Sequence, residues 1–360
     1  MPTSPGLRNM RPVLKSIVRR PKPTFQPVGT VVITGASSGI GRCTAGLLAR
    51  KGWRVGLIAR GQAGLQAVRD DVEREGARVM TAQADVTDPD ALEAAAAGIE
   101  RALGPIDVWV NCAGNATYGR FLDTPAEEFR RVTDVTYLGT VNGTRIALQR
   151  MMPRDRGRIV NVCSAVVYHG MPLLASYTGA KHAMRGFDQA VRAELLQEGS
   201  EVHLISVFPP AVNTPFCDHA ISHMGRPGRP MPPIYQPEVV AEAIHLAATG
   251  PSREMPVTFT TVLFALGVRL VPALVAMAIR RLGYDGQLTT QAAALARYDP
   301  TVFTASSQAS PVHGTFGAEA RSGSVHLRIL RVLAWLERPG HGGRAAKPVV
   351  TVRPVEDSPG

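Results

Sequence analysis

The chain has 360 residues, is 45% hydrophobic and 19% charged, and carries a formal net charge of +11. This is a normal globular balance, and the length fits one large α/β domain with extensions or two smaller domains. The four cysteines stand far apart, without a C-x-x-C pair or a histidine cluster, which argues against a disulfide framework and against a metal site. Free cysteines favour a reducing compartment, so we expect the protein in the cytoplasm.

The charge is unevenly distributed along the chain. No aspartate or glutamate precedes Asp70, whereas arginines and lysines recur throughout that part. Such a positive field attracts polyanions, either nucleic acid or a phosphorylated cofactor. The chain has no nucleic-acid recognition motif and no interleaved aromatic residues, which argues against nucleic acid. Residues 1–27 are predicted to form a flexible basic arm, and they lack the apolar run of a secretory signal.

A dinucleotide-binding loop is predicted directly after this arm. Residues 28–34 are β-branched and apolar, as in a buried strand, and TGASSGIG at residues 34–41 leads into a helical pattern over residues 42–51. Glycines between a strand and a helix let the backbone approach a pyrophosphate, and the helix N-terminus supplies amides and partial positive charge. The alternative is a simple glycine-rich turn.

The second predicted strand, residues 54–59, ends at Arg60. At this place in a dinucleotide fold a carboxylate binds the ribose 2′-hydroxyl, whereas an arginine accommodates a 2′-phosphate. Because no carboxylate is available here, Arg60, helped by Arg42, favours NADP(H) over NAD(H). The alternative is that both are ordinary surface arginines.

Strands and helices alternate over the rest of the core. Further strands are predicted at residues 78–83, 107–110, 158–162 and 201–208, and helices at residues 64–75, 90–103, 127–151, 176–197 and 237–248. This alternation predicts an α/β fold, a Rossmann-type doubly wound parallel sheet with helices on both faces. Ligands of such sheets bind at the carboxyl ends of the strands. The polar or glycine residues at or just after those ends are Gly41, Asn111, Ser164 and Thr214.

Tyr177 and Lys181 stand four residues apart in the helix predicted over residues 176–197, and therefore on one face of it. A tyrosine titrates near pH ~10, and a lysine held close favours the phenolate and lowers that pKa toward the working range of an acid or base. Lysine is rare in this arginine-rich chain, and arginine does not supply the same compact charge. The alternative is a tyrosine packed at a helix surface beside a solvated lysine.

Together these segments resemble the short-chain dehydrogenase/reductase (SDR) family over about residues 28–248. The resemblance rests on TGASSGIG at residues 34–41, ADVTD at 84–88, NCAG at 111–114, Ser164 thirteen residues before Tyr177, YTGAK at 177–181 and PPAVNT at 209–214. It implies an oxidoreductase that uses a nicotinamide cofactor to interconvert a ketone or aldehyde and an alcohol.

The resemblance also implies roles for individual residues. Tyr177 would be the general acid or base, Lys181 would lower its pKa and bind the nicotinamide ribose, and Ser164 would orient the substrate carbonyl. Hydride transfer to a carbonyl builds an alkoxide, so two hydrogen-bond donors on one oxygen suit this chemistry. The other predicted cofactor-binding residues are Gly35, Ser37, Ser38, Gly39, Ile40, Gly41, Arg42, Arg60, Asp85, Val86, Asn111, Ala113, Gly114, Pro209, Val212 and Thr214.

Two positions depart from the family pattern. Thr136 stands where the family usually has an asparagine that completes a proton relay to the lysine, so we count it among the catalytic positions and expect a weakened or rerouted relay. Pro210 stands where a glycine is usual, and it stiffens the turn beside the nicotinamide and cannot donate a backbone N–H.

The segments beyond the core leave more alternatives open. Residues 216–235, rich in Pro, Gly and Met, match the family's substrate lid and indicate a lipophilic substrate, or else a plain loop. Residues 257–279 are long enough to span a bilayer, but Arg269 near the middle costs ~2.5–3.5 kcal/mol there. The alternatives for this segment are a span, an interfacial helix, or core or subunit packing.

From residue 299 onward we expect a mostly disordered tail, with an amphipathic helix at residues 325–336 that fits a membrane surface or a partner groove, or packs back on the domain. The predicted organisation is therefore an arm (1–27), a catalytic domain (28–250), an apolar helical extension that is a candidate for membrane association (251–298) and a tail (299–360).

The predicted function is NADP(H)-dependent reduction or oxidation of a hydrophobic carbonyl or alcohol, lipid-, steroid- or polyketide-like. The alternative is a dinucleotide-binding regulatory or scaffold protein with impaired catalysis. The expected partners are the small substrate, a membrane surface and, by analogy with the family, a second copy in a homodimer or homotetramer; neither nucleic acid nor a metal is expected.

Overall fold

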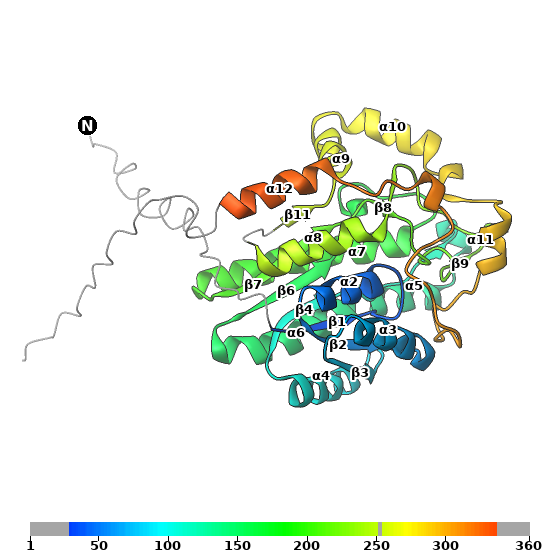
Figure 1. Cartoon of the computed structure of the whole chain (residues 1–360). Helices are drawn as coiled ribbons and strands as arrows, with labels where there is room; N and C mark the ends of the chain where they lie inside the picture. Colours follow the sequence, from blue (N-terminus) through cyan, green and yellow to red (C-terminus); the bar gives the residue numbers. More distant parts are fainter. Residues whose placement is uncertain (1–28, 251–253, 337–360) are drawn as a thin grey trace, which may run out of the picture.

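The computed structural model describes residues 29–250 and 254–336. Within that part of the chain the main sheet is parallel and has the strand order β11-β7-β6-β4-β1-β2-β3 (Figure 1). The order reverses between β1 and β4, which opens a crevice at the carboxyl ends of these strands. The predicted doubly wound α/β fold is confirmed. The strands are β1 (Thr30–Thr34), β2 (Arg54–Ala59), β3 (Val79–Gln83), β4 (Ile106–Asn111), β6 (Gly157–Val162), β7 (Val202–Phe208) and β11 (Glu254–Pro256).

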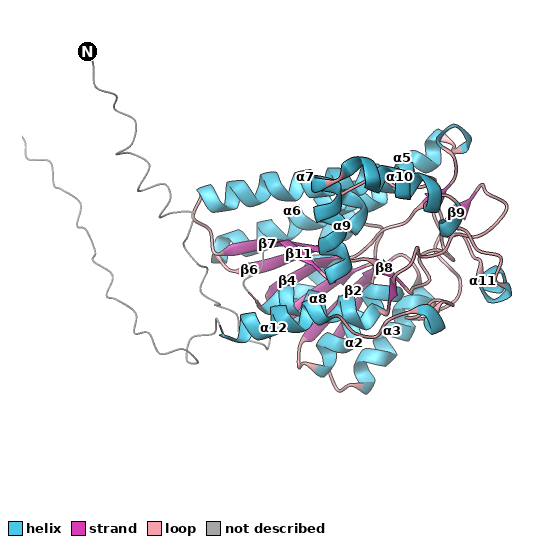
Figure 2. Ribbon diagram, turned by 90° about the horizontal axis from the view of Figure 1, so that it is seen from above, coloured by secondary structure: helices cyan, strands magenta, loops and turns pink. Residues whose placement is uncertain are grey.

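Two layers of helices cover the sheet. Viewed from above, α6 and α7 lie on one side of the strands and α2, α3 and α8 on the other (Figure 2). The layers consist of α2 (Gly39–Arg50), α3 (Gln62–Arg74), α4 (Pro89–Leu103), α5 (Ala126–Thr133), α6 (Gly139–Met151), α7 (Ala175–Gln197) and α8 (Pro237–Thr249).

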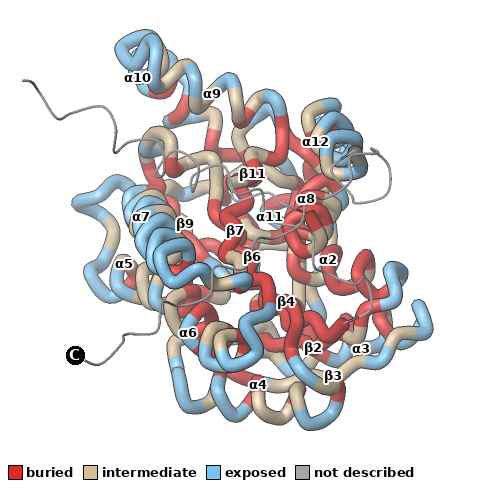
Figure 3. The backbone as a smooth tube through the Cα atoms, turned by 90° about the vertical axis from the view of Figure 1, so that its left-hand side faces the viewer, coloured by how far each residue is buried: buried red, intermediate tan, exposed pale blue. Residues whose placement is uncertain are grey.

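The strands are apolar on both faces because both faces are covered. Val31 and Ile33 pack with Leu48 of α2 on one side, whereas Val32 packs with Ile99 of α4 on the other, and all five side chains are fully buried. Figure 3 shows the strands as the most buried part of the tube, with exposed turns around them. This rigid sheet fixes where the strand ends lie, and so where the loops meet.

The long helix predicted over residues 127–151 is not continuous. Between α5 and α6 the chain forms one π-helical turn, η2 (Asp134–Leu138), in which Val135 and Thr136 are buried. A π-helical turn inside an α-helix adds a residue to the turn and is frequent at functional sites.

Residues 257–279 do not form one continuous helix. They are divided between α9 (Phe259–Leu270) and α10 (Pro272–Leu282), which meet at Val271 with a bend of 120°. Pro272 ends α9 because a proline disfavours helical backbone in the residue before it. No single helix in the described part of the chain is long and apolar enough to cross a bilayer, and this pair reaches the threshold only when its two helices are counted together.

From residue 299 the chain differs from the expected tail. Residues 299–336 pack on the domain and bury Val302, Phe316 and Leu327, with α11 (Ala292–Arg297) before them and α12 (Val325–Leu336) at their end. Residues 299–336 are mostly polar in sequence, so composition alone did not indicate these three buried apolar side chains. Residues 337–360, like the basic arm at 1–27, lie outside the described residues.

Helix α12 packs on α8 through a different side from the predicted stripe. Leu327 and Leu330 join the core beside α8, whereas Val325, Ile329 and Val332 are 54–70% exposed. The apolar stripe at helical spacing is therefore real, but it faces solvent. The helix is apolar on two sides, and only one of them is covered.

Candidate active site

A cavity of about 560 Å³ lies at the carboxyl edge of the sheet. It reaches from the glycine loop after β1, past the ends of β2, β4 and β6, to the segment between β7 and α8. Its lining includes these predicted site residues: Gly35, Ser37, Ser38, Gly39, Ile40, Gly41, Arg60, Asp85, Val86, Ala113, Gly114, Ser164, Tyr177, Lys181, Pro209, Val212 and Thr214.

The glycine loop forms a backbone cradle at one end of this cavity. Gly35 has φ +65°, and a Cβ there would lie 2.7 Å from the Cα of Ala113. At Gly39, with φ +49°, a Cβ would lie 3.0 Å from Cβ of Thr214. Helix α2 begins at this loop without a side-chain cap and without an acidic residue in its first turn. Backbone amides at a helix N-terminus that no side chain caps fit a pyrophosphate.

Ser164, Tyr177 and Lys181 meet further along the cavity. Ser164 follows β6, and helix α7 carries the other two side chains on one face. The Lys181 Nζ donates to the carbonyl oxygen of Val162 at 2.7 Å and lies 5.7 Å from the centre of the Tyr177 ring. The Tyr177 ring also packs against Phe216, 5.3 Å away between centroids. The hydroxyl groups of Ser164 and Tyr177 and the ammonium group of Lys181 therefore lie together at the cavity.

Burial dominates the electrostatics of this group. It raises the pKa of Tyr177 above its ordinary range, and the hydrogen bond with Ser164 offsets only part of that rise. Burial also lowers the pKa of Lys181. The direction for Tyr177 is opposite to the one expected from Lys181 alone, because burial of the phenol disfavours its charged form. In this arrangement Tyr177 is a neutral phenol, the form that donates a proton.

Thr136 does not reach the cavity. Its Oγ1 accepts from the backbone N–H of Asn115 at 3.2 Å and lies 3.3 Å from that residue's carbonyl oxygen, in a fully buried position. Asn115 lines the cavity in front of it. The threonine thus holds the loop after β4 instead of meeting Lys181.

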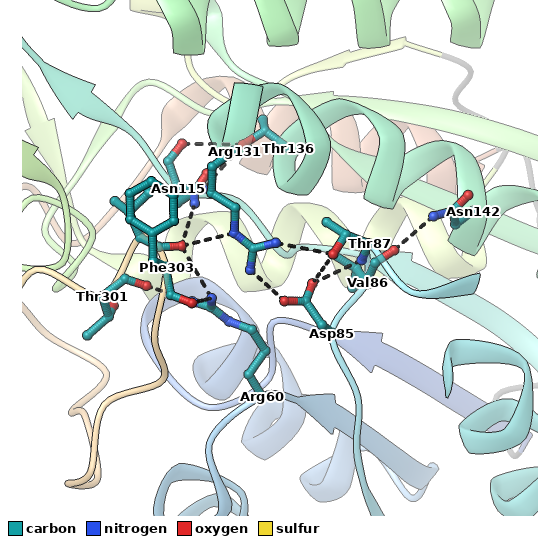
Figure 4. Close-up of polar contacts among 11 residues, drawn as sticks. Arg60, Asp85, Val86, Thr87, Asn115, Arg131, Thr136, Asn142, Thr301 and Phe303 are labelled. Carbon is teal, nitrogen blue, oxygen red and sulfur yellow. Dashed lines mark hydrogen bonds and ion pairs between the residues drawn. The ribbon is translucent and has the colours of Figure 1, made fainter. Parts of the chain in front are cut away.

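A cluster of charges surrounds the end of β2 (Figure 4). Arg131 of α5 forms an ion pair with Asp85 at 2.5 Å and donates to Thr87 Oγ1. Arg60 lies beside them, and burial lowers its pKa, with Arg131 lowering it further. Although burial raises the pKa of Asp85, the hydrogen bonds from Arg131 and Thr87 outweigh it and lower that pKa. The two guanidinium groups and the single carboxylate leave a net positive charge at this end of the cavity.

A segment from the C-terminal part of the chain covers this cluster. We call residues 301–311 the strap. The Arg60 guanidinium donates to the carbonyl oxygens of Thr301 at 2.7 Å, Val302 at 3.3 Å and Phe303 at 3.4 Å. Figure 4 shows the carbonyl oxygens of Thr301 and Phe303 directed at Arg60. Arg131 donates to the carbonyl oxygen of Val302 at 3.2 Å. The strap therefore contacts the side chain that the sequence assigns to a 2′-phosphate.

The strap also contacts the glycine loop. The backbone N–H of Gly39 donates to the carbonyl oxygen of Pro311 at 3.2 Å. Arg42 donates to the carbonyl oxygen of Ser310 at 2.8 Å and is paired with Asp71 at 2.6 Å. Carbonyl oxygens thus lie where phosphate oxygens of a dinucleotide are expected. The residues present fit such a cofactor, provided that the strap moves or exchanges these contacts.

Two predicted cofactor residues are placed differently from expectation. Arg42 is outside the cavity lining and is held by Asp71. Asn111 is buried inside the fold, where its Nδ2 donates to Asn161 Oδ1 at 2.8 Å and to Thr144 Oγ1 at 3.1 Å. A polar residue at a strand end carries no signal that distinguishes an inward from an outward side chain.

Three features of the site were missed from the sequence. Arg131 comes from a helix with no motif, and the strap follows a stretch of ordinary loop composition, so neither gave a local signal. Asn115 directly follows the NCAG segment and could have been found from that neighbour.

At the far end the cavity has apolar walls, formed by Tyr118, Leu174, Phe216, Met231 and Phe264.

Comparison with known proteins adds two relatives. The family model described as short chain dehydrogenase matches residues 29–224. An uncharacterized oxidoreductase of Bacillus subtilis, YxnA, is 32% identical over 283 residues, covering 78% of this chain and 79% of that protein. The 3-ketodihydrosphingosine reductase of Bos taurus is 32% identical over 200 residues, covering 54% of this chain and 60% of that protein.

Solved structures agree with these relatives. A single-residue variant of the actinorhodin polyketide ketoreductase, solved with NADPH, has a TM-score of 0.56 and 27% identity, covering 64% of this chain and 96% of that one. A short chain dehydrogenase from Mycobacterium paratuberculosis bound to NAD has a TM-score of 0.56 and 25% identity, covering 66% and 97%. These neighbours hold nicotinamide cofactors of both kinds. With its parallel sheet, glycine loop and matched core, the chain belongs to the short-chain dehydrogenase/reductase family of oxidoreductases.

Proposed function

We propose that this protein is an NADP(H)-dependent reductase or dehydrogenase that interconverts a ketone or aldehyde and an alcohol on a hydrophobic substrate. One observation carries the proposal. Ser164, Tyr177 and Lys181 meet between the glycine-loop end and the apolar end of one cavity. A carbonyl placed there has two hydroxyl groups for its oxygen and apolar walls for the rest of the molecule.

The proton chemistry follows from the state of Tyr177. When bound, the reduced nicotinamide supplies the hydride to the carbonyl carbon. The neutral Tyr177 phenol gives its proton to the carbonyl oxygen, and Ser164 donates a hydrogen bond to that oxygen while negative charge develops. The phenolate that remains is stabilised by the Lys181 ammonium. In the oxidation direction the same phenolate accepts the proton of the alcohol.

A hydrophobic ketone is the substrate class that the relatives support. One relative is named for the ketone of a sphingoid base and one structural neighbour for a polyketide ketone. The apolar end of the cavity in this chain includes Leu174, Phe216 and Met231, with the last two from the predicted lid. We therefore propose a long apolar ketone or the corresponding alcohol.

The test follows NADPH absorbance with a panel of apolar ketones. Tyr177→Phe should lower turnover by about 10²–10⁴-fold, because the proton donor is lost, while NADPH binding by fluorescence titration persists. Tyr284→Phe, a phenol 37% exposed outside the cavity lining, is the matched control and should leave turnover unchanged. If NADPH binds and no ketone or alcohol turns over, the regulatory or scaffold alternative replaces this proposal.

The proposed preference for NADP(H) over NAD(H) rests on the charges at the end of β2. Arg60 and Arg131 with Asp85 leave one net positive charge there, and an extra phosphate suits it. Binding of the phosphate requires Arg60 to leave the strap carbonyls. Arg60→Ala should lose about 10–100-fold in affinity for NADPH and little for NADH, as for one charge-assisted bond. Arg69→Ala, on the exposed side of α3, is the control; equal losses for both cofactors would refute the assignment.

A further inference from the structure

The hairpin formed by α9 and α10 exposes apolar side chains instead of burying them. We call these two helices the apolar hairpin. Figure 3 shows α10 almost wholly exposed. The outward leucines Leu263, Leu266, Leu270 and Leu274 are 47–73% exposed, and Phe259 is 58% exposed. Soluble monomers rarely leave such a contiguous patch uncovered without a partner.

The charges on the apolar hairpin are all of one sign. Arg269, Arg280 and Arg281 are exposed, and residues 255–284 contain no aspartate or glutamate. No ion pair is formed by these three arginines within the described residues. Leucines flanked by arginines, with no acidic residue, match the acyl chains and anionic headgroups of a lipid bilayer.

The shape of the apolar hairpin suits the surface of a bilayer. Helices of 12 and 11 residues are about 18 and 16 Å long, well short of the ~30 Å hydrocarbon core. The bend of 120° at Val271 turns α10 back against the direction of α9. The apolar hairpin can therefore enter one leaflet without crossing it.

The same hairpin forms part of the cavity wall. Part of α9 lines the cavity, through Thr260, Thr261 and Phe264. The exposed leucines of the same helix face solvent. At its other end, Gln287 after α10 donates to the carbonyl oxygen of Pro172 at 2.7 Å, in the loop before helix α7. Figure 1 shows α9 and α10 together at one end of the molecule, above α7 and α8. An apolar molecule could pass along α9 from lipid to Tyr177.

A second copy of this chain fits the surface less well. In a symmetric dimer the same patch meets itself, so an interface through the apolar hairpin brings three arginines close to three more. No carboxylate of the hairpin is available to pair with them. Like charges facing each other disfavour that contact.

We propose that the apolar hairpin docks on anionic phospholipid bilayers and admits an apolar substrate to the cavity from the lipid. The docking stands on the hairpin alone, whereas the substrate route rests on the proposed function. The two are tested separately, because vesicle binding needs no turnover.

The test is flotation of the full chain with phosphatidylcholine vesicles, with and without about a third of phosphatidylglycerol. We expect binding to the anionic vesicles that falls at least tenfold in Leu270→Asp/Leu274→Asp and weakens at high salt, as screened charges require. The double variant Leu196→Asp/Leu295→Asp is the matched control, because these leucines are 52% and 51% exposed on α7 and α11 and the charge change is equal.

Two outcomes overturn the docking proposal. One is flotation that is equal in all three proteins. The other is a self-associated chain, seen by light scattering, that does not float and that Leu270→Asp/Leu274→Asp converts to a monomer; the second copy is then the occupant. The substrate route fails separately if anionic vesicles bind the protein but do not raise turnover of a membrane-dissolved ketone relative to Leu270→Asp/Leu274→Asp.

Discussion

Thr136 holds the loop after β4 through a hydrogen bond to a buried backbone amide. Its Oγ1 accepts from the N–H of Asn115, and the side chain is fully buried in the π-helical turn. The valine side chain has the same shape but no acceptor, so Thr136→Val leaves that N–H without a partner. We expect a loss of about 1–3 kcal/mol in the free energy of unfolding by urea.

Thr136→Ser separates this role from packing. Serine keeps the oxygen and loses one methyl group, so it should retain more of the stability than valine does. If Thr136→Val has the same free energy of unfolding as the native protein, the hydrogen bond to Asn115 contributes nothing to stability. A role of Thr136 in the proton relay then becomes the better explanation.

Asp188 is a buried carboxyl group in the interior of α7. It accepts hydrogen bonds from Asn161 Nδ2 at 2.6 Å and Ser206 Oγ at 2.7 Å, yet burial raises its pKa to about 6. A carboxyl group with a raised folded-state pKa stabilises the fold below its unfolded pKa of ~3.9, and that contribution is lost as the pH rises through about 6.

Asp188→Asn should therefore remove a pH dependence. As the pH rises from 4 to 7, the free energy of unfolding of the native protein should fall by up to roughly 3 kcal/mol relative to that of the variant. Urea unfolding of both proteins at each pH measures this difference. Asp285→Asn, on a side chain 85% exposed, is the control. A constant difference between native protein and Asp188→Asn across this range would show that Asp188 keeps an ordinary pKa.

At the scale of elements, the strap is held to the sheet edge through Arg60. In Arg60→Ala the carbonyl oxygens of Thr301 and Phe303 lose their donor, whereas that of Val302 keeps its hydrogen bond from Arg131. We expect amide hydrogen exchange of residues 301–311 to become about 10-fold faster or more, since local opening then costs less free energy. NADPH added to the native protein should change exchange in the same direction, because a phosphate on Arg60 displaces the same carbonyls.

Exchange in Arg69→Ala serves as the comparison, since that side chain pairs with Glu73 on the far side of α3. Unchanged exchange of residues 301–311 in Arg60→Ala would mean that the strap is held by its buried Val302 instead.

Much of the element pattern could be predicted from the sequence. Strand β2 runs from Arg54 to Ala59 as expected, and the other five predicted strands differ by two residues or fewer at each end. Such agreement is physical, because strands covered on both faces are continuous apolar runs. The glycine loop, Ser164 and the Tyr177–Lys181 pair also line one cavity, as ligands of a parallel sheet require.

The remaining features depend on contacts that no local pattern records. Strand β11 (Glu254–Pro256) has three residues and exists because β7 offers a free edge. Asn111 turns inward because Asn161 and Thr144 satisfy its amide. Arg60 stands where expected, but its partners come from 241 to 243 residues further along the chain. The roles of the site residues stay predictions until turnover is measured.

At the scale of the whole molecule, residues 299–336 belong to the fold. Val302, Phe316 and Leu327 are each at most 5% exposed. Burial of one such side chain contributes about 1.5–3 kcal/mol, so a chain ending at residue 298 should lose on the order of 5–9 kcal/mol, close to the stability of a typical domain. Thermal unfolding measures this directly.

A chain ending at residue 336 is the comparison, because it keeps all three anchors. We expect it to unfold at the temperature of the full chain. A chain ending at residue 298 that also unfolds at that temperature would restore the picture of a dispensable tail.

The strap gives the fold a late step in synthesis. Residues 301–311 leave the ribosome after every strand of the main sheet, yet they complete the wall beside the glycine loop and Arg60. A nascent chain can therefore pair all its strands while the adenosine end of the crevice still lies open to solvent. Contacts so distant in sequence form slowly, so we expect this wall to close after the sheet has formed.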